Sequence, residues 1–176
     1  LNVIKDSIDN VRDTAASFSR AFVIETMGRN CGYLALVSAL CSGAELCLIP
    51  EINYDLKEYE ESFKEQIRSG RKYFIAVVSE GIKEESSEIA KWFEQKIGLE
   101  SRVTILGHTQ RGGNPTIYDR LMAYKFVTHA IDGLLDDKNE SVKKKKKKGF
   151  EYKSIDEVAN KKYELDNELL SYLKRF

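Results

Sequence analysis

The chain has 176 residues, enough for one domain with an extension and a buried core. Its 28 lysines and arginines balance 28 aspartates and glutamates, so no overall charge draws it to nucleic acid or to a membrane. No apolar run is long enough to span a bilayer, and residues 1–6 lack the layout of a signal peptide. Cys31, Cys41 and Cys47 lie in apolar stretches without a C-x-x-C pair, which predicts reduced core residues in a cytoplasmic protein.

In chain order, the spacing of apolar residues predicts an amphipathic helix over residues 2–14. Apolar and β-branched runs predict buried strands over 22–26, 46–49, 73–78 and 103–106. Helices are expected over about 32–41, 56–67, 89–97 and, as the longest, 116–135. Strands that alternate with helices of this length predict a layered α/β/α domain with a largely parallel sheet.

The expected organisation has four parts. An α/β domain over residues 1–115 is followed by a crossing helix over 116–135, a lysine-rich loop over 136–154 and a C-terminal helical segment over 155–176. The loop contains six consecutive lysines, 143–148, whose mutual repulsion favours a solvated loop. A patch for nucleic acid or anionic lipid and an artefact of the sequence remain open as alternatives.

Residues 106–115, LGHTQRGGNP, join an expected strand to an expected helix with Asn114 as N-cap and Pro115 at the first helical position. Free backbone N–H groups and the helix dipole attract an anion at such a junction. His108 and Arg111 add polar side chains that bind anions, although a plain glycine turn with surface side chains would have the same sequence.

Residues 22–36, FVIETMGRNCGYLAL, repeat this arrangement, because an apolar run again ends at a Gly-Arg turn before a helix. Two such junctions indicate a site for a phosphorylated ligand at the ends of strands. From about residue 9 to 135 the sequence resembles the 6-phosphofructokinase family, and it includes the words Pro50-Glu51, Ser79-Glu80-Gly81 and Tyr118-Asp119-Arg120. The resemblance is to the C-terminal portion of the bacterial, ATP-dependent type.

The resemblance implies roles for the residues of these loops. Met27-Gly28-Arg29 matches the loop whose backbone meets the sugar phosphate, with Arg29 as the catalytic residue that faces the transferring phosphoryl group. Glu80 matches a glutamate that accepts hydrogen bonds from sugar hydroxyls. His108 and Arg111 match the pair that contacts the 6-phosphate of the sugar.

The resemblance also implies that Arg20 and Arg102 reach the substrate site of a neighbouring subunit in a dimer or homotetramer. Both lie just before expected strands, where ordinary surface cations are common as well.

An effector site is implied at Arg12, Glu45 and Arg71, where a nucleoside diphosphate would bind and Glu45 would help to hold Mg²⁺. The family often has a further cation two positions before Arg71, but here that position is Ser69. Glu45 could also simply precede a strand.

The implied activity is the glycolytic, Mg²⁺-assisted transfer of a phosphoryl group from ATP to the 1-hydroxyl of fructose 6-phosphate, under allosteric control. The family's glycine-rich nucleotide loop and the Thr-Ile-Asp-Asn-Asp word that supplies its catalytic base do not occur in the sequence. We therefore expect the isolated chain to be inactive. A pyrophosphate-dependent phosphofructokinase and a non-catalytic module that binds a sugar phosphate or a nucleotide are the alternatives.

Overall fold

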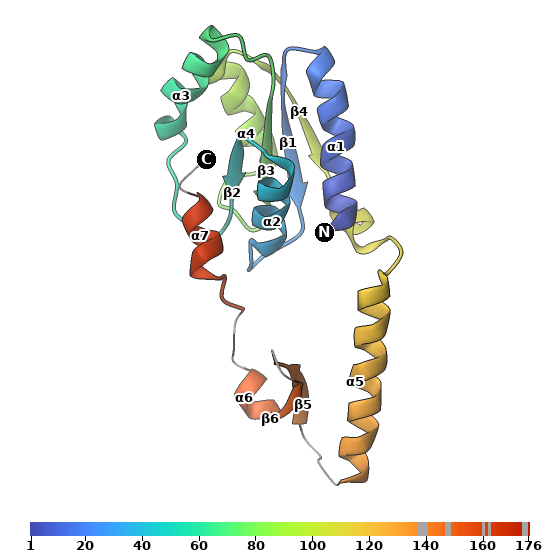
Figure 1. The fold of residues 1–176 in the computed structure, drawn as a ribbon. Helices are drawn as coiled ribbons and strands as arrows, with labels where there is room; N and C mark the ends of the chain where they lie inside the picture. The colour runs from blue at the N-terminus through green and yellow to red at the C-terminus, as the bar shows by residue number, and fades with distance from the viewer. Residues whose placement is uncertain (137–140, 147–148, 160, 162, 174–175) are drawn as a thin grey trace. The chain divides into compact units, whose positions relative to one another are not determined.

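The structure is a computed structural model, and it describes all residues except 137–140, 147–148, 160, 162 and 174–175. The described residues form two units (Figure 1). The first contains Leu1–Gly113 together with Glu164–Phe176, and the second contains Asn114–Tyr163.

A four-stranded parallel sheet in the order β2-β3-β1-β4 organises the first unit. Its strands are β1 (Arg20–Thr26), β2 (Leu46–Leu48), β3 (Phe74–Ser79) and β4 (Glu100–Ile105). Every residue of β3 is buried, as expected for a central strand covered on both faces. The predicted α/β fold with a parallel sheet is confirmed.

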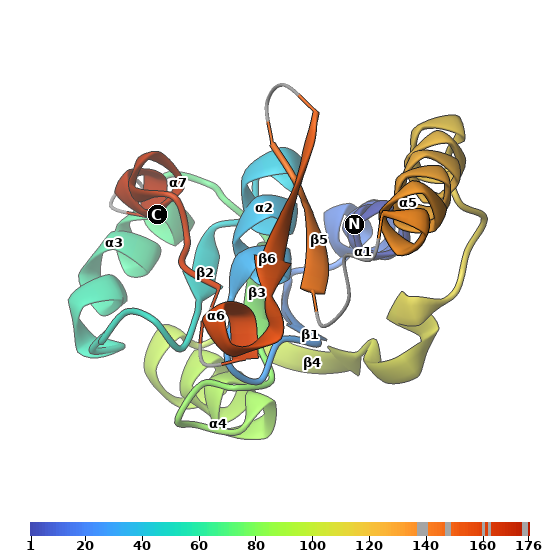
Figure 2. The ribbon, with the colours of Figure 1, turned by 90° about the horizontal axis from the view of Figure 1, so that it is seen from below.

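Helices cover both faces of this sheet (Figure 2). One face carries α1 (Asn2–Ser17) and α2 (Tyr33–Ser42). The other carries α3 (Lys57–Arg68), α4 (Ser86–Trp92) and the π-helix η1 (Phe93–Ile97). The expected helix over 89–97 therefore changes its hydrogen-bonding pattern at Phe93.

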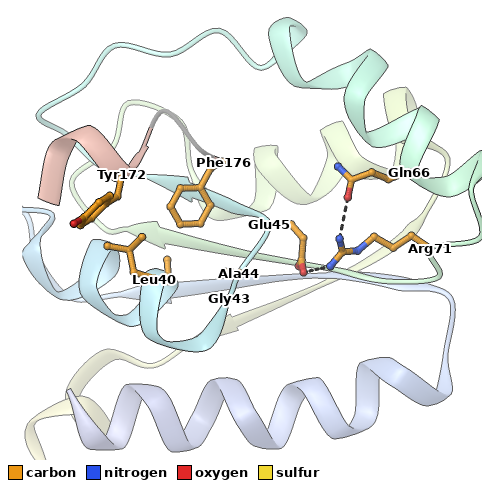
Figure 3. A pocket seen from close by; sticks show the side chains of 9 residues that line it. Leu40, Gly43, Ala44, Glu45, Gln66, Arg71, Tyr172 and Phe176 are labelled. Carbon is orange, nitrogen blue, oxygen red and sulfur yellow. Dashed lines mark hydrogen bonds and ion pairs between the residues drawn. The ribbon is translucent and has the colours of Figure 1, made fainter. Parts of the chain in front are cut away.

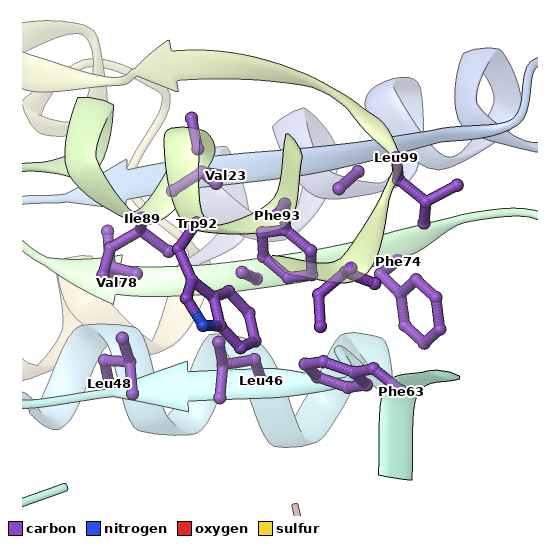
Figure 4. Close-up of a cluster of buried hydrophobic side chains, with 14 residues drawn as sticks. Val23, Leu46, Leu48, Phe63, Phe74, Val78, Ile89, Trp92, Phe93 and Leu99 are labelled. Atoms are coloured by element: carbon purple, nitrogen blue, oxygen red, sulfur yellow. The ribbon is translucent and has the colours of Figure 1, made fainter. Parts of the chain in front are cut away.

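Residues of β1 and β3 alternate between two hydrophobic cores, since successive side chains of a strand point to opposite faces. The core beneath α3 and α4 is rich in aromatic rings (Figure 4). Phe63 of α3 lies with its ring centroid 4.7 Å from that of Phe74, 5.6 Å from that of Phe93 and 5.9 Å from that of Trp92. These contacts attach α3, α4 and η1 to the sheet.

The sequence prediction for β4 was wrong in its burial. Val103 is 37% exposed and Ile105 is 64% exposed, because β4 is an edge strand with one neighbour in the sheet. Arg20 and Arg102 also lie within strands rather than before them. The strand leads into a short 3₁₀-helix, η2 (Gly107–Arg111).

The prediction of three core cysteines holds for Cys47 alone, which is buried. Cys31 is half-buried and Cys41 is exposed, since Cys41 lies on the outer side of the last turn of α2.

The second unit contains α5 (Ile117–Leu135), a hairpin of β5 (Ser141–Lys145) and β6 (Phe150–Ser154), and α6 (Ile155–Ala159). Thr116 is the N-cap of α5, not Asn114. Its hydroxyl accepts a hydrogen bond from the Asp119 N–H at 3.2 Å, and its own N–H donates to the Asp119 carboxylate at 3.0 Å. This reciprocal box satisfies two donors of the helix start, which Asn114 and Pro115 do not.

The hairpin corrects the expectation of a loop over 136–154. Lys143 lies over the Tyr152 ring, with its Nζ 3.7 Å from the ring centroid, and donates a hydrogen bond to the His129 carbonyl at 3.2 Å. A lysine can therefore occupy a strand here, because its stem covers an aromatic ring and its charge is compensated. Lys147 and Lys148 lie outside the described residues.

The C-terminal residues do not form one segment. The helix α6 belongs to the second unit, whereas α7 (Asn167–Leu173) belongs to the first and packs its leucines against the core beneath α2. Among the described helices, none is both long and apolar enough to cross a membrane.

Candidate functional site

The carboxyl ends of the four parallel strands lie at one edge of the sheet, here called the carboxyl edge. Met27 and Gly28 follow β1, Glu80 follows β3, and η2 follows β4 at this edge. Ligands of open α/β sheets bind outside this edge, because the loops there converge from several strands. The loops named in the sequence analysis are thus neighbours in the sheet.

Two hydrogen bonds join these loops to one another. The Gly28 N–H donates to Glu80 Oε1 at 3.2 Å, and the Met27 N–H donates to Gln110 Oε1 at 3.0 Å. The loop after β1 is therefore held between the loops after β3 and β4. Gln110 belongs to η2, so the same contact sets the position of that helix beside Met27.

Close packing of the backbone requires glycine at two positions of this edge. Gly28 has a φ of 143°, and a Cβ there would lie 2.5 Å from the Cys31 carbonyl oxygen. A Cβ on Gly81 would lie 1.9 Å from the Arg29 carbonyl oxygen. The Ser79 hydroxyl donates to the Gly28 carbonyl at 2.6 Å, which further holds this loop. The backbone that carries Arg29 is therefore closely packed against the neighbouring loops.

Three cationic or polar side chains at the carboxyl edge are exposed: Arg29, His108 and Arg111. In the part of the chain that the structure describes, none of the three forms an ion pair with a carboxylate. His108 and Arg111 are three residues apart in a 3₁₀-helix, where positions i and i+3 eclipse, so both leave η2 on one side. The side chains of His108 and Arg111 can therefore both donate hydrogen bonds to one anionic group.

Arg20 and Arg102 lie elsewhere. Arg20 opens β1 and pairs in register with Glu100, and its Nε donates to Glu100 Oε2 at 2.7 Å. Arg102 contacts the other oxygen of Glu100. The bond from Arg20 lowers the pKa of the Glu100 carboxyl. Met27 lies seven positions after Arg20, about 23 Å along an extended strand, so the structure does not bring these arginines to the carboxyl edge of their own chain.

Glu45 and Arg71 lie at the opposite, amino edge of the sheet, where they line a cavity of about 430 Å³ (Figure 3). The Glu45 side chain is 7% exposed, pairs with Arg71 and accepts a hydrogen bond from the Ile75 N–H at 2.6 Å. Burial raises the pKa of the Glu45 carboxyl, against the opposing effects of the Ile75 hydrogen bond and of the charges on Arg71 and Arg12.

Arg12 is not among the residues that line this cavity in the described part of the chain. Its guanidinium binds the Ser42 carbonyl and, at 3.2 Å, the Gly43 carbonyl. A cation at the carboxyl end of a helix satisfies carbonyls that the helix leaves unpaired. Ser69 donates its hydroxyl to the Gln66 carbonyl at 2.8 Å, which ends α3 and provides no cation.

A Mg²⁺ ion would need more oxygen ligands than the Glu45 carboxylate provides. The residues that the structure describes contain no group of three or more His, Cys, Asp or Glu side chains arranged to hold a metal. Mg²⁺ is commonly bound by one or two carboxylates together with water and phosphate oxygens. Glu45 fits such a site only if a ligand brings the remaining oxygens.

Gln110, Ser79 and Gly81 also contact the loop after β1, although no sequence motif predicted a role for them. Each lies next to a residue that was singled out. Their position beside these residues was the only hint in the sequence that they belong to the site. The contacts themselves join positions more than 50 residues apart, which local patterns do not reveal.

Comparisons with known proteins identify the family and support the fold. The family model described as Phosphofructokinase matches residues 1–134. The chain is 75% identical over its whole length to an ATP-dependent 6-phosphofructokinase of Sulfurimonas denitrificans, of which it covers 55%, and 56% identical to that of a Sulfurovum species, of which it covers 54%. The chain thus spans about half the length of these relatives. The phosphofructokinase structure from Saccharomyces cerevisiae matches 89% of this chain with a TM-score of 0.79 at 33% identity, over 22% of its own length.

Proposed function

Because this chain belongs to the phosphofructokinase family, we propose that it provides the fructose 6-phosphate half of a cytoplasmic, glycolytic ATP-dependent 6-phosphofructokinase. The reaction transfers a phosphoryl group from ATP to the 1-hydroxyl of fructose 6-phosphate and yields fructose 1,6-bisphosphate. ATP is the proposed donor rather than pyrophosphate, since the relatives described above are named ATP-dependent.

One observation carries the proposal: three loops converge at the carboxyl edge, and two of them present Arg29, His108 and Arg111, which have no carboxylate partner among the described residues. His108 and Arg111 leave η2 on one side and would bind the 6-phosphate together. Arg111 offers a planar fork of donors that matches phosphate oxygens.

Glu80 and Arg29 would act at the other end of the sugar. One oxygen of Glu80 accepts the Gly28 N–H, so its carboxylate is anchored and can accept hydrogen bonds from sugar hydroxyls. Arg29 would stabilise the negative charge on the transferring phosphoryl group. Catalysis of phosphoryl transfer depends mainly on such positioning and electrostatic stabilisation.

The donor half would come from outside this sequence, because neither the glycine-rich nucleotide loop nor the catalytic-base word of the family occurs in it. Mg²⁺ would arrive with ATP and neutralise charge on its phosphates. The non-catalytic alternative therefore describes this chain in isolation, which we expect to bind substrate without turning it over.

Arg20 and Arg102 would serve a neighbouring subunit in a dimer or tetramer. Their position, far from the carboxyl edge of their own chain, is consistent with this role. The cavity at Glu45 and Arg71 would bind a nucleoside diphosphate, which would give the enzyme allosteric control. Arg12 would support that site indirectly, through the turn at Gly43.

Equilibrium binding of fructose 6-phosphate to the chain tests the proposal. The chain should bind fructose 6-phosphate in calorimetry, and His108→Ala should weaken binding by about tenfold or more, since a hydrogen bond to a charged group contributes about 1.5–3 kcal/mol. His129→Ala, in the second unit, is the matched control. Equal affinities of the His108→Ala variant and the unaltered chain would refute the site, and turnover with ATP by the chain alone would refute the assignment of the donor half.

A further inference from the structure

Two consecutive backbone N–H groups connect the loop after β1 to the loops on either side of it. The strand β1 lies between β3 and β4 in the sheet. The Gly28 N–H donates a hydrogen bond to Glu80, in the loop after β3, and the Met27 N–H donates one to the side chain of Gln110, in η2 after β4. The loop that carries Arg29 is therefore bonded to both of its neighbours at the carboxyl edge.

Gln110 lies on a different side of η2 from His108 and Arg111. Successive residues of a 3₁₀-helix are rotated by about 120°, so Gln110 lies about a third of a turn from the side that the other two share. Gln110 is half-buried, whereas His108 and Arg111 are exposed. The glutamine therefore contacts the protein while the two neighbouring side chains stay open to a ligand.

The contact from Gln110 continues the connection between β1 and β4 beyond the end of the sheet. The Leu106 N–H, just before η2, donates to the Glu25 carbonyl at 3.1 Å. Among the hydrogen bonds of the described residues, the bond from Met27 to Gln110 is the one that joins η2 itself to the loop after β1. Without it, η2 could shift relative to that loop.

A ligand that contacts Glu80 and His108 at once must extend across the end of β1. Neighbouring strands lie about 4.8 Å apart, so the loops after β3 and β4 are about 10 Å apart at this edge. The bonds from Gly28 and Met27 set the separation of these two loops. A shift of η2 would therefore weaken a ligand that touches both loops more than a ligand that touches η2 alone.

We propose that Gln110 is a positioning residue, whose hydrogen bond to the Met27 N–H holds η2 at the distance from Glu80 and Arg29 that fructose 6-phosphate requires. The inference rests on the fructose 6-phosphate site proposed above. Gln110 acts through the loop after β1 and does not touch the substrate. A neutral amide suits this position, because a carboxylate would accept the same N–H but would place a negative charge close to the sugar phosphate.

Binding of fructose 6-phosphate and of inorganic phosphate to the chain distinguishes positioning from a general loss of structure. Gln110→Met removes the acceptor and keeps a side chain of similar length. It should weaken fructose 6-phosphate binding about fivefold, the effect of one hydrogen bond, and leave binding of inorganic phosphate at His108 and Arg111 unchanged. Gln95→Met, the same substitution at an exposed position of η1 at the amino edge, is the matched control and should change neither.

Hydrogen exchange of the Met27 N–H, measured by NMR, gives a second measurement. Exchange should be faster in Gln110→Met than in the unaltered chain and slow again in Gln110→Glu, whose carboxylate restores the acceptor. Equally fast exchange in both variants, or no change in either, would refute the proposed bond.

The binding results separate failure of this inference from failure of the proposed function. If the unaltered chain binds fructose 6-phosphate and Gln110→Met binds it equally well, the positioning role is refuted and the site stands. The same holds if Gln110→Met weakens inorganic phosphate as much as fructose 6-phosphate, since Gln110 would then only support the fold of η2. If the unaltered chain binds no fructose 6-phosphate, the proposed function is refuted together with the positioning role.

Discussion

Charge pairing separates the arginines of this chain into two kinds. Arg20 and Arg102 share the carboxylate of Glu100, whereas Arg29 and Arg111 have no carboxylate partner among the described residues. A paired arginine must give up its partner to bind an anion, and an unpaired one need not. This difference, rather than exposure, identifies the cations at the carboxyl edge as available to a phosphate.

Replacement of Arg111 should show this availability. Arg111→Ala should weaken fructose 6-phosphate binding more than tenfold, because a charge-assisted contact of about 1.5–3 kcal/mol is lost. Arg111→Lys should restore part of the affinity, since the charge returns without the planar fork. Arg68→Ala, which removes a surface arginine paired with Glu65, is the control for the measurement by calorimetry. Unchanged affinity in both Arg111 variants would remove this residue from the site.

Glu45 should make stability depend on pH. Burial raises its pKa in the folded chain above the ordinary value of 4.5, so the folded chain holds the proton more tightly than the unfolded chain. The stabilisation from this group is complete below pH 4.5 and is lost as pH rises through the raised pKa. Urea unfolding from pH 4 to 8 should show the free energy of unfolding decline relative to that of Glu45→Gln. The opposite slope would mean that the Arg71 pair outweighs burial.

At the scale of elements, the β5–β6 hairpin shows how a lysine run becomes a strand. The side chain of Lys143 lies over the Tyr152 ring, and the Tyr152 hydroxyl occupies the space where Gly133 of α5 has no side chain. Glu151 compensates a further lysine, since it pairs with Lys146. Successive lysines of β5 point to opposite sides of the strand, with Lys143 half-buried and Lys144 exposed, so repulsion between neighbours in the sequence is reduced.

Alternation predicts unequal effects for adjacent lysines. Lys143→Ala should lower the free energy of unfolding of the second unit by about 0.5–2 kcal/mol, through loss of the cation–π contact and of the covering stem. Lys144→Ala, at an exposed neighbouring position, should change it by less than about 0.5 kcal/mol. Thermal or urea unfolding of both variants provides the comparison. Equal effects would show that the run acts through its total charge.

At the scale of the whole molecule, the sheet places the proposed site residues at two opposite ends. His108 lies beyond the carboxyl end of β4, and Arg20 lies at the amino end of β1. A single chain therefore cannot bring Arg20 to the sugar-phosphate site proposed at its own carboxyl edge. If each site were shared between subunits, Arg20 of one chain could reach the proposed site of its neighbour. Substrate binding would then be coupled to assembly.

Mixing of two variants tests sharing between subunits. In the complete enzyme proposed above, Arg102→Ala and His108→Ala should each lose most of the activity when fructose 6-phosphate is kept below the KM of the unaltered enzyme. Co-assembled oligomers should regain part of the activity, because some sites then contain both an intact Arg102 and an intact His108. The measurement is a coupled assay on mixed oligomers whose formation is verified by size and composition. Mixed oligomers as inactive as either parent would assign Arg102 to its own chain.

Local patterns in the sequence were sufficient for the four strands of the parallel sheet, for most of the helices and for the loops that follow those strands, but not for the β5–β6 hairpin. The strand β3 and the helix α5 are examples, because β-branched runs and helical spacing act over a few residues. Three features needed the tertiary structure: the contact between Met27 and Gln110, the separation of Arg20 from the carboxyl edge, and the return of α7 to the first unit. Each depends on which distant segments pack together, and hydrophobic burial selects that arrangement without leaving a periodic signal in either segment.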